Sequence, residues 1–419
     1  MITKASRMEH TLTADAHWRE RAARVIPGGM YGHMNASRDK LPSSYPQYYV
    51  KGKGARLWDV DGNEYIDYLC AYGPMILGYV HPEVEKVAAK QQANGDGLSG
   101  PTPLMVELAE TLTEKVAHAD WSIFAKNGTD ATSIAVMTAR AATGRKKLLK
   151  ARRAYHGASV WFTPQAGGIT PQDRENIIEF EFNDQASLEL AALKAGDDLA
   201  AVILPPFRHD SYADQEEVLP AFARAARALT TRMGAVLILD EVRSCLRLDI
   251  RGAWTSIGVF PDLTAFSKSL ANGFPLAAIT GTEALREAAK SIFVTGSFWY
   301  HGVPMAAALE TLRIIEAVDG PSVMRTSGEL LRTGLNEQAE SYGFSLRQTG
   351  PASMPMIAFD DDPQMERIYS FSDAAVRQGV LFHPWHNMFI SLAHTQEEID
   401  KTLVATEKAF EELSRNINK

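Results

Sequence analysis

Apolar and polar positions alternate along the middle of the chain with two different periods. Uninterrupted apolar runs of strand length occur at residues 199–206 and 235–242. Between these runs, residues 219–234 predict a helix that a glycine closes. Apolar strands separated by helices are typical of a sheet that is buried on both faces and runs largely parallel. We therefore expect an α/β fold with such a sheet at its centre.

The same alternation extends from about residue 82 to about residue 311. Apolar side chains recur at helical spacing over residues 101–116. Residues 121–128 then predict a strand that ends in a glycine, and residues 130–143 predict a helix. This stretch is long enough for one large domain, which we place at residues 76–315.

Both ends of the chain have a different pattern. Residues 15–25 predict a short helix, and residues 49–70 contain two alternating runs around an Asp-Gly turn, which is a hairpin signal. Beyond about residue 311 there are helices and mixed strands, and a polar helix is predicted at 396–416. We expect the N-terminal segment 1–75 to contribute to a smaller α+β domain that residues 316–419 complete.

Composition and charge exclude several classes of partner. The chain has 419 residues, of which 45% are hydrophobic and 22% charged, and its formal net charge is -8. An acidic chain with one short basic cluster, at residues 144–153, is a poor candidate for binding nucleic acid or an anionic membrane surface. No apolar run reaches membrane-spanning length, and residues 1–12 contain no apolar signal core. Cys70 and Cys245 are far apart in the sequence and have apolar neighbours, which favours buried free thiols over a disulfide. Free thiols are typical of a reducing compartment, so we expect a cytoplasmic protein.

Chemically informative residues follow several predicted strands, at the sheet edge where α/β proteins bind ligands. In KNGTDAT, residues 126–132, a helix begins next to Gly128 and Thr129, so its free amides could bind an anion such as a phosphate. Capping of that helix by Thr129 or Asp130 is the alternative. In RAYHGAS, Tyr155 could stack on a planar ligand, or it could be a half-buried packing residue.

Two further strand ends carry an acid and a lysine. Asp240 ends the strand in LILDEV and needs several hydrogen bonds or a cationic partner, which could be a protonated pyridine nitrogen or an arginine. Lys268 lies in AFSKSLANGFP, among mostly small and apolar residues. Desolvation disfavours the charged form of such a lysine, and a neutral amine forms Schiff bases with carbonyls. The alternative is a surface lysine with a packed stem and a solvated head. We expect Asp240 and Lys268 to close on one cavity from neighbouring strands.

A phosphate site, a stacking aromatic ring, an acid and a desolvated lysine are together the groups that pyridoxal 5'-phosphate needs. At these residues the sequence resembles the class III aminotransferases of fold type I, in the branch near glutamate-1-semialdehyde aminomutase. The resemblance covers nearly the whole chain and rests on RVIPGG, LWDVDGNEYIDY, NGTDAT, AYHG, LDEV, SKSLANGFP and SLAHT. It implies a large domain with a mostly parallel central sheet and a smaller α+β domain built from both termini.

The resemblance also implies a role for each matching residue. It assigns cofactor contacts to Gly128, Thr129, Tyr155, His156, Asp240, Val242, Lys268 and Ser297. Lys268 would form the Schiff base with the cofactor and later remove the proton from the carbon that bears the amine. Asp240 would keep the pyridine nitrogen protonated. Ser297, where threonine is usual, would reach the phosphate in the partner subunit, which implies a homodimer with shared active sites.

A narrower resemblance concerns the substrate. The stretches RERAARVIPGGMYGH, HADWSIFAKNGTDATS, PFRHD, VTGSFWY and HPWHNMF look like the bacterial fumonisin aminotransferases, which deaminate a long-chain amino alcohol with pyruvate as acceptor. We therefore expect transfer of an amino group from a bulky or long-chain amine or amino alcohol to pyruvate, giving a ketone or aldehyde and L-alanine. Relatives that act on β-amino acids carry an arginine in the stretch matching residues 383–389, and this chain has none there.

Arg208 is therefore the candidate for binding the acceptor's carboxylate, because an arginine fork matches it bidentately. A structural ion pair of Arg208 is the alternative. The wall of the substrate site is expected at five residues, each of which could also be a packing residue: Tyr31, His33, Tyr72, Trp299 and His386.

Two other functions stay open at the level of sequence. One is an intramolecular 2,1-aminomutase of the glutamate-1-semialdehyde type, which needs no external acceptor. The other is a non-catalytic relative of the fold that binds a metabolite or a partner protein. The natural amine, the stereochemical preference and the pairing of dimers into tetramers cannot be predicted from the sequence.

Overall fold

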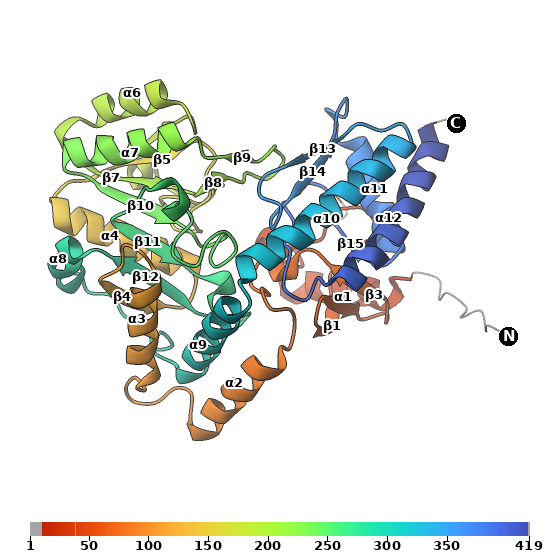
Figure 1. The fold of residues 1–419 in the computed structure, drawn as a ribbon, viewed down its shortest axis with the longest axis horizontal. Coiled ribbons are helices and arrows are strands. Elements are labelled where there is room, and N and C mark those ends of the chain that lie inside the picture. Colours follow the sequence, from red (N-terminus) through yellow and green to blue (C-terminus); the bar gives the residue numbers. More distant parts are fainter. Residues whose placement is uncertain (1–10, 38, 418–419) are drawn as a thin grey trace.

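The computed structural model of the chain describes residues 11–37 and 39–417, and its largest feature is a seven-stranded sheet (Figure 1). The strand order is β4-β12-β11-β10-β7-β5-β6. Its strands are β4 (Trp121–Ala125), β5 (Lys147–Ala151), β6 (Ile177–Phe180), β7 (Leu199–Leu204), β10 (Val236–Asp240), β11 (Leu263–Phe266) and β12 (Ala277–Gly281). The five strands from β11 to β6 pair in parallel, whereas β12 runs antiparallel to both of its neighbours. The expected largely parallel sheet is thus confirmed.

Helices cover both faces of this sheet, which explains its uninterrupted apolar runs. Leu237 and Leu239 of β10 pack in one cluster with α6 (Gln185–Ala195) and α7 (Pro220–Met233). Val236 and Ile238 point the other way and pack in a second cluster with α4 (Gly128–Thr143). Because alternate side chains of a strand face opposite sides, every position in such a strand must be apolar.

The two ends of the chain meet in a second, four-stranded sheet. Its order is β1-β2-β3-β15, in which β15 (Val380–Leu381) pairs in parallel with β3. The N-terminal strands are β1 (Tyr49–Lys53), β2 (Arg56–Asp59) and β3 (Glu64–Asp67). The hairpin expected around the Asp-Gly turn is therefore present between β2 and β3. Figure 1 shows these red strands beside the blue C-terminal elements. The domain boundaries at residues 75 and 315 stay a prediction.

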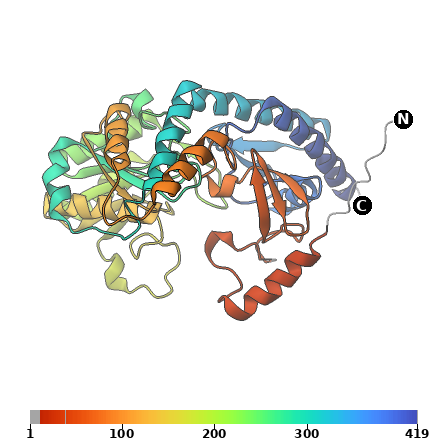
Figure 2. The ribbon, with the colours of Figure 1, turned by 90° about the horizontal axis from the view of Figure 1, so that it is seen from below.

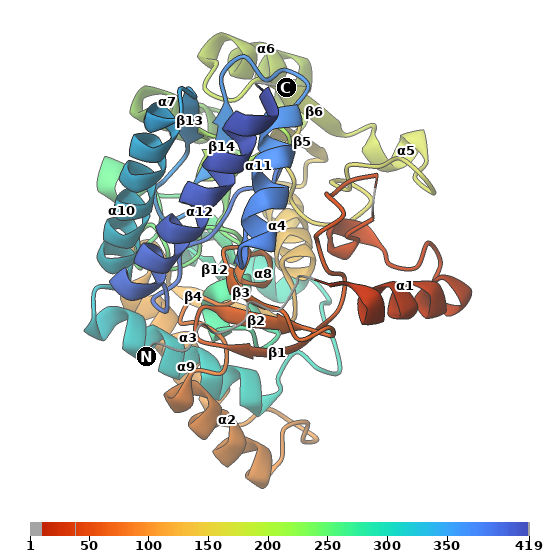
Figure 3. The same cartoon turned by 90° about the vertical axis from the view of Figure 1, so that its right-hand side faces the viewer.

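The C-terminal part surrounds an aromatic core. Its helices are α10 (Gly320–Ser341), α11 (Glu366–Arg377) and α12 (Gln396–Ile417), and its hairpin is formed by β13 (Leu346–Thr349) and β14 (Met356–Phe359). Figure 3 shows the three helices lying side by side. The ring centroids of Phe371 and Phe410 are 4.5 Å apart between α11 and α12. The polar helix predicted at 396–416 is α12.

The remaining elements connect the two sheets or lie at the edges. They are α2 (Pro82–Asn94), α3 (Leu104–Lys115), α5 (Pro171–Arg174), β8 (Phe207–Arg208), β9 (Glu216–Glu217), α8 (Arg286–Ser291) and α9 (Gly302–Ala317). Both cysteines are buried and unpaired, as expected. Across the described ranges, no helix combines the length and apolar character needed to span a bilayer. Most of the segment expected to lack a signal core, residues 1–10, lies outside those ranges.

Helix α1 (Thr13–Val25) lies at the edge of the molecule, beside the strands of the smaller sheet (Figure 2). Asp61, in the β2–β3 turn, accepts hydrogen bonds from the backbone amides of Ala14 (2.7 Å) and Asp15 (2.9 Å). The hairpin turn thus supplies the carboxylate that caps this helix, in place of a residue of the helix itself.

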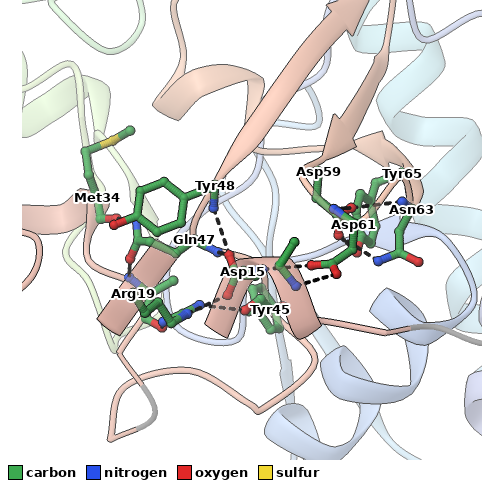
Figure 4. Close-up of polar contacts among 12 residues, drawn as sticks. Asp15, Arg19, Met34, Tyr45, Gln47, Tyr48, Asp59, Asp61, Asn63 and Tyr65 are labelled. Atoms are coloured by element: carbon green, nitrogen blue, oxygen red, sulfur yellow. Dashed lines mark hydrogen bonds and ion pairs between the residues drawn. The ribbon is translucent and has the colours of Figure 1, made fainter. Parts of the chain in front are cut away.

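A buried carboxylate fixes the chain that follows α1 (Figure 4). Asp15 is fully buried and accepts hydrogen bonds from the amides of Gln47 (2.6 Å) and Tyr48 (3.0 Å) and from Nε of Arg19 (2.5 Å). Arg19 in turn donates to the carbonyl oxygens of Ala36 and Tyr45. The helix, the loop at residues 31–36 and the start of β1 are therefore held together by one charged network.

Candidate active site

Asp240 and Lys268 follow adjacent parallel strands at the same edge of the large sheet. Asp240, the last residue of β10, is in register with Ala265 of β11, and Lys268 comes three residues later. Because the carboxyl ends of parallel strands meet at one edge, the acid and the amine open into the same space.

The backbone at Lys268 is held in an uncommon conformation. Lys268 has a φ of +49° and begins a short 3-10 turn, Lys268–Ala271. The flanking serines fasten the turn: Oγ of Ser267 donates to the carbonyl of Leu276 (2.9 Å), and Oγ of Ser269 donates to that of Cys245 (2.6 Å). A non-glycine residue at positive φ persists only where its surroundings impose it.

The surroundings of Lys268 also favour the uncharged amine. Burial, together with the positive charges of Arg243 and Arg247, lowers the pKa of Lys268 to about 7, although Asp240 opposes the change. A large fraction of this amine is therefore a neutral nucleophile at neutral pH. The side chain of Lys268 is thus enclosed, which the surface alternative does not expect, and its role as a nucleophile stays a prediction.

His156 holds the carboxylate of Asp240. Nδ1 of His156 lies 2.7 Å from Oδ2 of Asp240, and the amide of Val242 donates to the other oxygen (3.1 Å). His156 is 1% exposed and Asp240 is 6% exposed. The resemblance placed His156 among the cofactor contacts; the structure brings its Nδ1 to Asp240, and a contact of His156 with the cofactor stays a prediction. Nε2 of His156 is buried and has no protein partner among the described residues.

The first turn of α4 forms a narrow cradle. A Cβ atom added to Gly128 would lie 2.6 Å from Cγ1 of Val242, and one added to Gly157 would lie 2.8 Å from Oγ1 of Thr129. Oγ1 of Thr129 accepts a hydrogen bond from the amide of Ala158 (3.0 Å), so its own hydrogen can be donated elsewhere. Only glycine at these two positions allows the helix start and the loop at residues 156–158 to approach so closely.

The cap of α4 differs from both residues that the sequence offered. The side chain of Asn127 accepts hydrogen bonds from the amides of Thr129 (3.0 Å) and Asp130 (3.2 Å). Asp130 reciprocates by accepting from the amide of Asn127 (3.1 Å). The capping box therefore leaves the amide of Gly128 and the hydroxyl of Thr129 for an anion.

These residues fit pyridoxal 5'-phosphate. The start of α4 suits the phosphate, Asp240 suits a protonated ring nitrogen, and Lys268 suits the aldehyde. Tyr155 is 42% exposed beside the buried His156, so one face of its ring is free for a planar group. Val242, packed against Gly128, lies on the same strand end as Asp240.

Three of the five expected wall residues come together next to Lys268. The ring of Tyr72 lies 4.7 Å from that of His33 and 5.2 Å from that of His386, and its hydroxyl donates to the carbonyl of His33 (2.8 Å). A Cβ added to Gly73 would lie 3.4 Å from Cδ of Lys268. Burial lowers the pKa of His33 to about 4 and that of His386 well below its usual value, so both rings are neutral near pH 7.

The other expected residues lie elsewhere. Tyr31 is 74% exposed in the loop before the turn Gly32–Met34. Ser297 and Trp299 belong to the turn between α8 and α9, where Trp299 folds against Gly296. Within the described chain, no recorded contact connects these three side chains with Lys268.

Arg208 has carboxylate partners of its own. Its Nη1 lies 3.1 Å from Glu216 on the paired strand β9, and its Nε lies 3.6 Å from Asp210. These ion pairs favour the structural alternative for this residue. Arg243, which the sequence analysis did not single out, directly follows the LDEV stretch, three residues after Asp240, and donates to Oδ1 of Asn387 (2.6 Å). Its position just beyond the end of β10 was the signal available in the sequence.

Comparisons with known proteins extend over the whole site. The family model Aminotransferase class-III matches residues 40–410. The aminopentol aminotransferase of Sphingopyxis macrogoltabida is 49% identical over 399 residues, covering 95% of this chain and 94% of that protein. A structure of the FumI protein of Sphingopyxis sp. MTA144 in its PLP internal aldimine form superposes with a TM-score of 0.95 at 47% identity, covering 97% of both chains. The glutamate-1-semialdehyde 2,1-aminomutase of Natranaerobius thermophilus is 31% identical, covering 93% of this chain and 96% of that protein.

Proposed function

The chain belongs to the class III aminotransferases, which use pyridoxal phosphate, and from this we propose that it transfers an amino group from a bulky or long-chain amine or amino alcohol to pyruvate. The products are a ketone or aldehyde and L-alanine. The observation that carries the donor class is the wall beside Lys268, where Tyr72, His33 and His386 present neutral aromatic rings. The similarity to an aminopentol aminotransferase supports the same class.

Pyridoxal phosphate, when bound, supplies an aldehyde that takes up amines and a ring that accepts the electrons of the broken C–H bond. Lys268 is the residue that would hold the aldehyde of the cofactor. Its free amine would remove the proton from the substrate carbon that bears the nitrogen and would later return a proton. Its lowered pKa suits this double role, because the amine can gain and lose a proton near neutral pH.

Asp240 provides the negative charge that stabilises a proton on the ring nitrogen. His156 fixes the orientation of that carboxylate through the contact of its Nδ1 with Oδ2 of Asp240. Gly128 and Thr129 would bind the phosphate, and Tyr155 and Val242 would contact the ring. These groups keep the ring still while Lys268 moves protons at the substrate carbon.

The donor's apolar body lies against the histidines and Tyr72. An amine with no carboxylate needs no cation there, and neutral imidazoles can still accept or donate hydrogen bonds to hydroxyl groups of an amino alcohol. Tyr31 and Trp299 would extend the wall from outside this cluster. We further propose a homodimer in which Ser297 reaches the phosphate of the partner subunit, since Ser297 is exposed and far along the chain from the cradle.

Absorbance of the bound cofactor tests the proposal. A long-chain amine, L-alanine and glutamate are added separately to purified protein, and the visible band of the cofactor is followed. The band should disappear with the amine and with L-alanine, but not with glutamate. Bleaching by glutamate alone would contradict pyruvate as the acceptor. A band that persists with every donor would contradict transamination and favour the 2,1-aminomutase reaction of the similar proteins.

A further inference from the structure

Arg243 carries a positive charge on which the carboxylates of Asp240 and Asp210 act only from a distance, without a direct ion pair. Its Nη1 donates to the carbonyl of His209 (3.0 Å) and to Oδ1 of Asn387 (2.6 Å), which are both uncharged acceptors. Within residues 11–37 and 39–417, no carboxylate forms an ion pair with it. Burial lowers the pKa of Arg243 to about 10, so the guanidinium keeps its charge at neutral pH.

The position of Arg243 brings this charge to the reacting centre. Arg243 follows Asp240 by three residues, on the loop that leaves the end of β10. Among the described groups, its charge acts on Lys268, Tyr155 and His33, which line the space above the strand ends. Arg243 therefore faces the same opening as the lysine, between the cofactor residues and the aromatic wall.

The contacts of Arg243 also fix its direction. Both hydrogen bonds use Nη1, and they come from two segments far apart in sequence, at His209 and Asn387. The edge formed by Nε and Nη2 has no hydrogen-bond partner among the described residues. The guanidinium group is thus held at Nη1 and open along its Nε–Nη2 edge. That edge can donate two parallel hydrogen bonds to a carboxylate.

The other arginines near the site are unsuited to this task. Arg247 is 1% exposed, lies 5.0 Å from the centre of the Phe389 ring, and has all three side-chain nitrogens sealed from solvent. Arg208 is engaged by Glu216 and Asp210. Of these three described arginines, Arg243 is the one that has an open edge, forms no ion pair and acts on Lys268.

We propose that Arg243 binds the carboxylate of a short 2-keto acid acceptor and of the amino acid formed from it. The identity of that acceptor as pyruvate rests on the proposed function. A fixed cation beside Lys268 orients the carbonyl carbon of the acceptor, while an amine donor without a carboxylate makes no use of it. The two half-reactions in this site thereby use different binding groups. The neutral aromatic wall binds the donor, and the charge of Arg243 binds the acceptor.

Variants at Arg243 test this separation. Arg243→Met removes the charge and keeps the length of the side chain, and Arg243→Lys keeps the charge without the fork. Arg227→Met is the control, because Arg227 is a partly buried arginine on α7 that pairs with Asp262 (2.9 Å). We expect Arg243→Met to lower kcat/KM for L-alanine and for pyruvate by about 100-fold, while the half-reaction with a long-chain amine changes by less than about threefold. Arg243→Lys should lie between these values, and the control should match the unaltered enzyme.

Binding of propionate gives a second measurement that needs no turnover. Calorimetry with the holoenzyme should show saturable binding that Arg243→Met abolishes and the control retains. If the unaltered enzyme binds propionate through Arg243 but converts no amine, the proposed function fails and the assignment of Arg243 stands. Equal losses in both half-reactions with a displaced cofactor band would overturn the assignment, because Arg243 would then act on the cofactor. Loss of pyruvate activity in Arg208→Met but not in Arg243→Met would overturn it in favour of Arg208.

Discussion

Nδ1 of His156 lies 2.7 Å from Oδ2 of Asp240, and both side chains are nearly closed to solvent. A carboxylate so placed can keep a proton on the ring nitrogen of the cofactor, and the histidine fixes its direction. Asp240→Asn should retain some cofactor but lower kcat by about 10²- to 10³-fold, because the neutral amide no longer balances the positive nitrogen. His156→Gln should cause a smaller loss.

Steady-state kinetics with cofactor content measured by absorbance checks this prediction. His118→Gln is the matched control, since His118 is a half-buried histidine that contacts Thr264 (3.1 Å) away from the site. A near-normal rate for Asp240→Asn would refute the role given to the acid.

Lys268→Ala should abolish turnover and the visible absorbance of the cofactor bound to the lysine, because no other amine among the described residues stands at the strand end beside Asp240. Lys150→Met is the control: Lys150 is 8% exposed and pairs with Glu179 (2.8 Å) on the same sheet. This control should lose stability at most and keep its activity per folded molecule. An active Lys268→Ala enzyme would contradict the role of Lys268 as the residue that binds the cofactor's aldehyde.

The pH dependence of cofactor uptake follows from the lowered pKa of Lys268. Below a pKa of about 7 the amine is protonated and cannot attack an aldehyde, whereas above it the amine is free. The rate at which cofactor-free protein binds pyridoxal phosphate should therefore rise between about pH 6 and pH 8 and then level off. Stopped-flow absorbance measures this rate. A rate that keeps rising to about pH 10, as for an ordinary lysine, would contradict the prediction.

The buried carboxylate of Asp15 should control the aromatic wall from a distance. Asp15→Asn places an amide against the backbone donors of Gln47 and Tyr48 and removes the charged partner of Arg19. We expect the change to lower the free energy of local unfolding by about 3 kcal/mol. Amide hydrogen exchange over residues 13–48 should accelerate, and KM for a bulky amine should rise while KM for L-alanine changes little. Glu20→Gln, which alters an exposed ion pair on the same helix, should change neither quantity. Equal effects on both substrates would show that the network supports the whole site.

Glu241 should make the protein less stable as the pH rises. Burial raises the pKa of Glu241 from 4.5 to about 8, so the folded protein keeps a proton there that the unfolded chain releases. The free energy of unfolding therefore falls between about pH 4.5 and pH 8. Glu241→Gln keeps the acceptor for the amide of Ala253 and cannot ionise, so it should be more stable than the unaltered protein at pH 8. Urea unfolding at about pH 5 and pH 8 measures the difference, and parallel pH profiles for the two proteins would contradict it.

The central sheet could be predicted because its strands are buried on both faces. Every side chain of β7 is buried, so its sequence is apolar without alternation. The antiparallel direction of β12 could also have been predicted, since the connection from Phe266 to Ala277 is too short for a crossover between parallel strands. The pairing of β15 with β3 could not be predicted, because it joins segments more than 300 residues apart through only two residue pairs.

The candidate site also contains features that the sequence could predict and features that it could not. Asp240 and Lys268 could be predicted as neighbours because both end strands of one parallel sheet. For Arg208 the sequence left a carboxylate-binding role and a structural ion pair open, and the acids close by in sequence, Asp210 and Glu216, favour the ion pair. The contact of His156 with Asp240 depends on the path of a loop, and the position of Ser297 relative to a partner subunit depends on a second chain.

The groups around Lys268 come from two sources. The acid, the lysine and the phosphate cradle belong to the middle of the chain, whereas the aromatic wall comes from its two ends, at His33 and Tyr72 on one side and His386 on the other. Mutations in the terminal segments can thus alter which amines enter without touching the residues that break the C–H bond. For laboratory evolution we therefore expect libraries confined to residues 31–36, Tyr72 and His386, which leave Asn387 and its bond to Arg243 intact, to explore new donors on an unchanged reaction.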